Sequence, residues 1–525
     1  MSVSFRSLAL VLPALAFAAT LVGSGSEAHA ANFIVTNTGD LPDITPGDGT
    51  CVTVSGFCSL RAAVMEANAF AGADTITVPA GTGPISLSTL GTGTNTAATG
   101  DLDISERLTI VGNGVAIDGL NDDRIFHVLS SITADISGVT LTNGWGLVGG
   151  AIYNQGYLTL SDSTLADNVA TGEGGAINNI SPGSLVMTSC ELYGNEADSG
   201  GAIYSVTDLS IDDSSIIQNE AARYGGGMYV VGSADTEITD SYVGENIAGE
   251  RGGGIATLSP VNLVDSTVEW NTAGTFGGGL YMYTGNAVVD AFRTDFASNF
   301  ADEGAGIYNF WGDLTLRRVG VFANHATTMG GGINNQGTLT ARRGAIHDNS
   351  ATAGAGIYNF WNNADLTLKN MTVSGNDATG NAGGLYVHTN SVAALNNVTI
   401  TNNTGTSGGL DSSGTTTMSN TILGGNFDLV GGASDCVGSM TSDGYNLVED
   451  TMGCTISGPA TADIYGVAPG LNPLASNGGP TQTHSVRAGS AARSGGDNAT
   501  CQPVDQRGAG RPLGGICDIG AYERN

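Results

Sequence analysis

Side chains that can bind ions recur at one position of a repeating pattern in this chain. The position lies six residues before a recurring asparagine, and its occupants change in blocks from acidic to basic to amide. They are Asp162, Ser189, Asp213, Asp240, Asp265, Arg293, Arg318, Arg343, Asn370, Asn397 and Asn420. If the repeats stack in register, a cation such as calcium can bridge Asp213, Asp240 and Asp265 through their carboxylate oxygens.

The basic block of the same column predicts a site for an anion. Arg293, Arg318 and Arg343 can share an anionic sugar or sulfate, and Arg317 and Arg342 add to the positive charge. The alternative for the whole column is a plain turn between strands. Asp and Asn favour turns, and salt screens exposed charges.

A second acidic group lies earlier in the chain. Asp118, Asp122, Asp123 and Arg124 fall within seven residues, and carboxylates beside an arginine can hold calcium and a general base. A polar turn between two early coils is the alternative. The histidines after the first thirty residues show no zinc spacing.

Aromatic residues repeat in two places. The segment Gly-Ile-Tyr-Asn-Phe-Trp occupies residues 306–311 and again 356–361. Phe310, Trp311, Phe360 and Trp361 can therefore form a platform for sugar rings, or they can cover the surface of the fold by packing on one another.

These residues belong to a repeat of about 26 residues. A small, Gly-rich step followed by an aliphatic residue occurs eleven times, at spacings of 24 to 28 residues. The aliphatic residues are Ile152, Ile177, Ile203, Met228, Ile255, Leu280, Ile307, Ile333, Ile357, Leu385 and Leu410. A fixed period of this size means that one structural unit is stacked on itself.

Within each repeat, apolar residues lie three, eight and usually ten positions before an asparagine. An example is Leu158, Leu160 and Leu165 before Asn168. Apolar residues two apart indicate short strands with one buried face. Three such strands per repeat, with no helical segment, predict an all-β, right-handed parallel β-helix of the pectin-lyase-like kind. Leucine-rich and other helix-containing repeats are the weaker alternative.

The asparagines should turn inward. Each side-chain amide can donate to the carbonyl of the next coil and so satisfy backbone that would otherwise be buried and unpaired. An open end of such a solenoid needs a cap. We expect a short capping helix from Leu60 to Phe70, with Ser59 as its N-cap.

The start of the chain and its cysteines indicate export. Residues 1–30 have a basic start, an apolar run and Ala28-His29-Ala30 before a cut at Ala31, as in a signal peptide. Disulfides are typical of exported proteins. The spacing pairs Cys51 with Cys58, Cys436 with Cys454, and Cys501 with Cys517. Cys190 is left as a small buried residue. We expect no transmembrane segment after signal removal.

The net charge of −32 argues against nucleic acid and anionic membrane surfaces as partners.

The charge and motifs suggest four segments. They are a signal peptide at 1–30, a cap and first coils at 31–100, β-helix repeats at 101–430 and a C-terminal region at 431–525.

Three motifs resemble known bacterial surface proteins. Cys58-Ser59-Leu60-Arg61 is similar to the CSLREA domain, although Ala62-Ala63 replaces the usual Glu-Ala. Gly149-Gly150-Ala151-Ile152 with Leu165-x-x-Asn168 resembles the repeats of polymorphic outer-membrane proteins. Asn477–Thr481, Asp505–Gly508 and Cys517–Glu523 resemble the choice-of-anchor Q region. The resemblance implies an exported β-helix protein, extracellular or associated with the outer membrane.

We therefore expect a non-catalytic protein that presents a repeat surface for adhesion or glycan binding. Its partners would be extracellular polysaccharide or the surface of a host or neighbouring cell, with no required cofactor. The alternative is a polysaccharide lyase or glycoside hydrolase that uses calcium, which would need a convergent acid–base cluster. Whether the chain is an enzyme is left open by the sequence.

Overall fold

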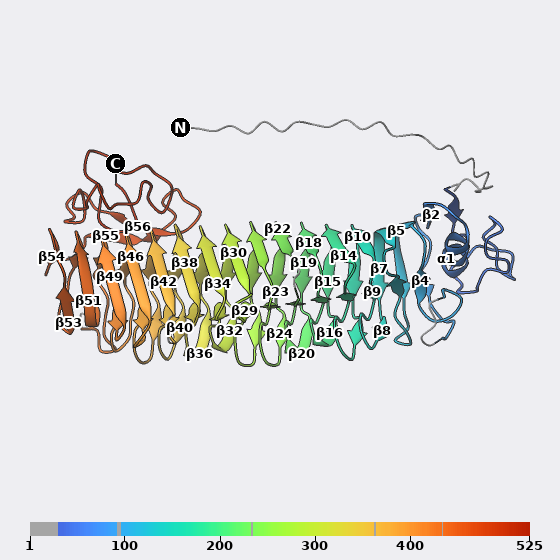
Figure 1. Ribbon diagram of the computed structural model, residues 1–525, viewed down its shortest axis with the longest axis horizontal. Coiled ribbons are helices and arrows are strands. Elements are labelled where there is room, and N and C mark those ends of the chain that lie inside the picture. Colours follow the sequence, from blue (N-terminus) through green and yellow to red (C-terminus); the bar gives the residue numbers. More distant parts are fainter. Residues whose placement is uncertain (1–29, 92–95, 233–234, 362–363, 433, 525) are drawn as a thin grey trace, which may run out of the picture.

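The computed structural model describes residues 30–91, 96–232, 235–361, 364–432 and 434–524. These residues form an all-β, right-handed-type parallel β-helix of about 14 turns, with one short helix near the N-terminus. Figure 1 shows a long rod with the helix at one end and the C-terminal region packed along the side of the last coils. The predicted signal peptide lies outside the described residues, Ala30 excepted.

A middle coil illustrates the repeat. It contains β33 (Ile307–Phe310), β34 (Asp313–Arg317), β35 (Gly320–Phe322) and β36 (His325–Met329). The first three strands pair in register with β37 (Ile333–Asn335), β38 (Thr338–Arg342) and β39 (Ala345–His347) of the next coil. Three strands per coil were predicted; the fourth, β36, belongs to a separate ten-stranded sheet.

The interior is a continuous stack of the predicted apolar residues. Ile307, Leu314, Leu316 and Val321 of the middle coil are at most 1% exposed. Burial of each such side chain contributes on the order of 1.5–3 kcal/mol. Parallel pairing repeats each position at every coil, so the sequence period becomes a column of like side chains.

The recurring asparagines form a buried ladder, as predicted, but its hydrogen bonds run differently. The side-chain amide of Asn195 donates to the carbonyl of Leu165 in the preceding coil, at 3.0 Å, and not to a carbonyl of the next coil. It also donates to Oδ1 of Asn219 in the next coil, at 2.9 Å. A second, unpredicted ladder joins Asn309 to Asn335 and Asn335 to Asn359.

The N-terminal helix α1 (Leu60–Ala69) begins where the sequence predicted and ends one residue earlier. Ser59 is its N-cap and accepts a hydrogen bond from the backbone N–H of Ala62, at 3.0 Å. Arg61 is fully buried and pairs with Asp40, at 2.7 Å. Its guanidinium also donates to two backbone carbonyls, so this buried charge is satisfied.

All three predicted disulfides are present: Cys51–Cys58, Cys436–Cys454 and Cys501–Cys517. Cys190 is free and buried, and burial raises the pKa of its thiol to about 11.

In the C-terminal region, β55 (Leu471–Ala475) and β56 (Thr483–Val486) form an antiparallel pair. Among the described helices, none is long and apolar enough to cross a membrane.

Candidate functional site

The mixed column from Asp162 to Asn420 forms one corner of the solenoid. All eleven members have φ between 46° and 61°, the left-handed region that Asp and Asn tolerate better than most residues. The residues just before them pair in register from coil to coil, for example Phe292 with Arg317 and Arg317 with Arg342. The corner is therefore a turn, and its positions repeat in register from coil to coil.

The acidic part of this corner lines an open groove of about 710 Å³ that includes Asp162, Asp213, Asp240 and Asp265. Ser189 donates to Asp213, at 2.8 Å. Asp265 accepts two hydrogen bonds from the guanidinium of Arg293, and this contact lowers the pKa of Asp265. Asp265 and Arg293 thus satisfy each other, which removes one predicted cation ligand and one predicted anion ligand.

The basic part lines a pocket of about 370 Å³ under the C-terminal region. Its cationic residues are Arg317, Arg318, Arg342, Arg343 and Lys369; Phe292, Asn370, Gln502, Pro503 and Val504 complete the lining. Arg317 pairs with Asp290, at 2.6 Å. Among the described residues, the other four cations form no ion pair, and no carboxylate lines the pocket. Burial and the nearby Arg318 lower the pKa of Arg343.

Lys369 is the member of this pocket that sequence analysis missed. Lys369 ends strand β42 (Asp365–Lys369), which follows β38 in the same row of strands. It pairs in register with Arg342 of β38. The register of the repeat already placed it beside Arg342, so the signal was present in the spacing. The walls at 502–504 could not be found this way, because they come from a distant part of the chain.

The amide part of the corner docks the C-terminal region. Asn370 donates to the carbonyl of Val504, at 2.8 Å. Asn397 accepts from the backbone N–H of Gln502, at 2.9 Å, and its amide donates to the carbonyls of Asp518 and Gly520. These asparagines are at most 3% exposed. Their role is to bind the chain's own backbone.

The two aromatic pairs lie where sugar rings could reach them. Trp311 and Trp361 are 51% and 44% exposed. Phe310 stacks on Trp311, with 4.4 Å between ring centroids, and Phe360 meets Trp361 edge to face. The pairs lie two coils apart, about 10 Å by the spacing of neighbouring strands.

The early acidic group is only partly brought together. Asp122, Asp123 and Arg124 line a hollow of about 180 Å³. Asp118 does not line this hollow, and its carboxylate accepts a hydrogen bond from the side chain of Asn143, at 3.0 Å. Burial raises the pKa of Asp123. Arg124 points to Asp101 instead, at 2.9 Å.

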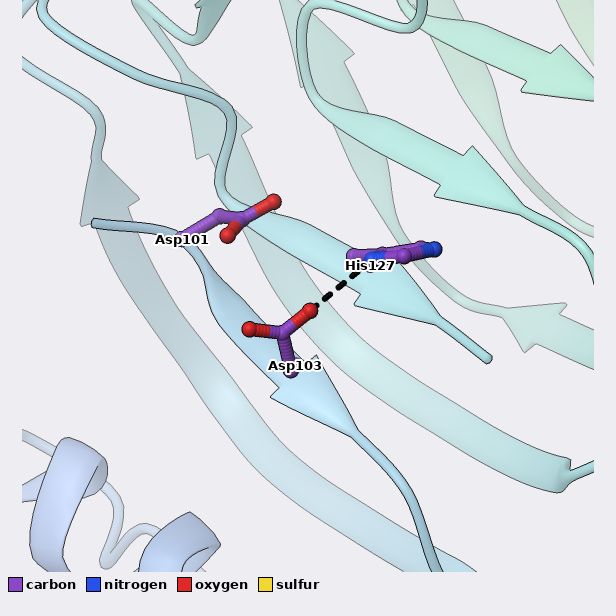
Figure 2. A group of neighbouring side chains, drawn as sticks. All are labelled: Asp101, Asp103 and His127. Carbon is purple, nitrogen blue, oxygen red and sulfur yellow. Dashed lines mark hydrogen bonds and ion pairs between the residues drawn. The ribbon is translucent and has the colours of Figure 1, made fainter. Parts of the chain in front are cut away.

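Asp101, the partner of Arg124, belongs to a group of side chains that sequence analysis missed. Asp101 precedes β4 (Leu102–Ile104), which contains Asp103; His127 lies in the adjacent strand β6 (Phe126–Val128). The three offer ligand atoms within 4.8 Å of one another, and all three residues are buried. Nδ1 of His127 lies 2.8 Å from Oδ1 of Asp103 (Figure 2).

A signal for this group was present in the sequence. Asp103 and His127 are 24 residues apart, one repeat, and they are register partners in the structure. Asp101 and Asp103 are two apart, so they share the outer face of one strand. A site built across coils does not have the short ligand spacing of common zinc motifs, so His127 carries no local sign of it.

Comparisons with known proteins identify no family for this chain. No family model matches this chain, and no curated protein does. Among solved structures, the chain is similar to pectate lyase Pel9A, with 13% identity and a TM-score of 0.25, over 95% of this chain and 98% of that chain. A likeness of this size assigns no activity. The resemblance to CSLREA-domain and choice-of-anchor proteins stays a prediction.

Proposed function

We propose that this chain is an exported β-helix protein that binds acidic polysaccharide at the cationic pocket formed by Arg317, Arg318, Arg342, Arg343 and Lys369. The observation that carries the proposal is the concentration of five cations around about 370 Å³ in a chain whose net charge is −32. Arg presents a planar fork of donors that fits carboxylate and sulfate oxygens.

The open face of the pocket suits a polymer. The pocket lies at the corner of a rod, and its cations come from three successive coils, so a chain running along the rod can meet them in turn. The three disulfides agree with an oxidising compartment outside the cell. Adhesion to a polysaccharide-coated surface would follow from binding of this kind.

The test is retention of the purified protein on immobilised dextran sulfate and polygalacturonate, with neutral dextran as the uncharged probe. We expect retention on an acidic polymer that salt weakens. Arg318→Glu and Lys369→Glu should each weaken binding at least tenfold, or about 1.4 kcal/mol. The matched control is Arg107→Glu, an exposed cation in the first coils. Unchanged binding of Arg318→Glu to both acidic polymers would contradict the proposal.

The aromatic pairs supply a further part of the proposed surface. We propose that Trp311 and Trp361 stack on sugar rings, because both indoles are about half exposed. Trp311→Ala should reduce retention without a change in salt dependence. If it lowers thermal stability and leaves retention unchanged, the pair serves packing alone.

The alternative, a polysaccharide lyase or hydrolase, is tested by assaying the same mixtures of protein and polysaccharide for cleavage products. With calcium present, new reducing ends or unsaturated-uronate absorbance that disappears in Asp122→Ala would place the chain among enzymes. The observation in its favour is the convergence of Asp101, Asp103, Arg124 and His127. Against it, Asp103 and His127 are 1% and 6% exposed, which leaves little room for a polymer to reach them.

A further inference from the structure

The Asp101, Asp103 and His127 group is distinct from the proposed polysaccharide site and lies toward the opposite end of the rod. Asp101 and Asp103 project from the outer face of β4, because Leu102 and Ile104 between and beyond them fill the core at 0% exposure. His127 projects from the same face of β6. Figure 2 shows the three side chains gathered over these two strands.

The group contains an unsatisfied charge-bearing atom. Oδ1 of Asp103 contacts His127, but Oδ2 is buried and has no hydrogen-bond partner among the described residues. Leaving a buried carboxylate oxygen without a partner destabilises the fold, because the oxygen has lost its contacts with water. A bound cation would satisfy this oxygen.

Neighbouring side chains hold His127 and Asp101 in place. Nε2 of His127 lies 3.1 Å from Oε1 of Gln155, and the ring stacks on Tyr153, with 5.0 Å between centroids. Arg124 donates to Oδ2 of Asp101, at 2.9 Å. Outer partners of this kind fix the tautomer and position of metal ligands.

The donor set selects the metal class. Calcium prefers an all-oxygen shell, whereas zinc and its neighbours among the divalent transition metals accept imidazole together with carboxylates. We propose that Asp101, Asp103 and His127 bind one divalent transition-metal ion, zinc by preference, which fastens the N-terminal cap to the first coils.

The link to the cap is direct. Asn68 of helix α1 donates to the backbone carbonyl of Asp103, at 2.7 Å, and accepts from the backbone N–H of Ser105, at 2.9 Å. A metal held by Asp103 would therefore stabilise the contact between α1 and the first full coil. Binding to the folded state alone raises stability with metal concentration.

The experiment uses tag-free, metal-stripped full chain. Zinc chloride is titrated, bound zinc is measured by plasma mass spectrometry, and unfolding is followed by circular dichroism. We expect one zinc per chain, a zinc-dependent rise in melting temperature, and no comparable effect of calcium chloride. His127→Asn should bind zinc at least tenfold more weakly. Gln155→Ala, which leaves all three ligands, should weaken binding by about tenfold.

His347→Asn is the matched control. His347 is 6% exposed and also contacts an aspartate, Asp348, at 2.7 Å, but no second carboxylate groups with it among the described residues. It should keep full zinc binding. If the folded wild-type chain takes up no stoichiometric zinc, or if His127→Asn binds it as tightly as wild type, the contact is only a His–Asp hydrogen bond and the proposal is wrong.

Discussion

Asp265 and Arg293 occupy equivalent corners of successive coils, and Nε and Nη2 of Arg293 donate to the two carboxylate oxygens of Asp265. The pair marks the point where the corner column changes from acidic to basic. On one side lies the aspartate groove, and on the other lies the cationic pocket. Beyond this pair, the acidic block and the basic block of the column each run along the rod without contacting the other block, among the described residues.

The Asp265–Arg293 pair should contribute to stability at neutral pH and not in acid. The contact with Arg293 holds the pKa of Asp265 below its usual 3.8. A lowered folded-state pKa means that the contribution is present above the unfolded pKa and lost as pH falls through the folded value. We expect Asp265→Asn to melt below wild type at pH 7, and the difference to shrink as pH falls below 3.8 and to vanish below the lower folded-state pKa. Asp212→Asn, at an exposed aspartate, should show no such pH dependence.

Removing one rung of the asparagine ladder should be strongly destabilising. The Asn299 amide donates to the Val268 carbonyl and to Asn324, and its Oδ1 accepts from Asn271. Asn299→Ala leaves several buried groups unpaired, and we expect a loss of about 3 kcal/mol in urea unfolding. Asn262→Ala, on an outward strand position, should change little. Similar losses for both variants would contradict a special role of the ladder.

Asp240→Asn should be neutral or slightly stabilising. Asn suits the left-handed corner as well as Asp does, and the change removes repulsion between stacked aspartates, about 0.5 kcal/mol at low salt. The measurement is melting temperature with and without calcium. A calcium-dependent rise in wild type that Asp240→Asn abolishes would instead support a shared ion in the aspartate groove.

Asn397→Ala should loosen the C-terminal region. The side chain is fully buried and holds the backbone at Gln502, Asp518 and Gly520. We expect proteolytic cleavage after residue 470 to speed up at least tenfold, since the docked state loses more than about 1.4 kcal/mol. Polysaccharide retention should fall as well, because residues 502–504 form a wall of the cationic pocket. Unchanged cleavage would mean that the other contacts suffice.

The sequence by itself determined the repeat architecture of this protein. Apolar residues at fixed spacings can be buried together only if equivalent positions stack. The apolar positions before Asn168 and before each later asparagine of the series therefore specified the coil. Local cysteine spacing predicted the three disulfides, and Ser59 predicted the start of α1. Position in the repeat also paired Arg317 with Arg342.

Only the tertiary structure decided what each column faces. The corner asparagines are buried because residues 497–520 fold back on them. The repeat placed Arg293 one coil after Asp265, but only the structure shows that the two side chains turn toward each other. The group formed by Asp101, Asp103 and His127 arises from contact between adjacent coils near the cap. Such contacts depend on side-chain direction and on segments that are distant in the sequence. The spacing of residues in the sequence predicts side-chain direction, but it does not predict which distant segment packs against a coil.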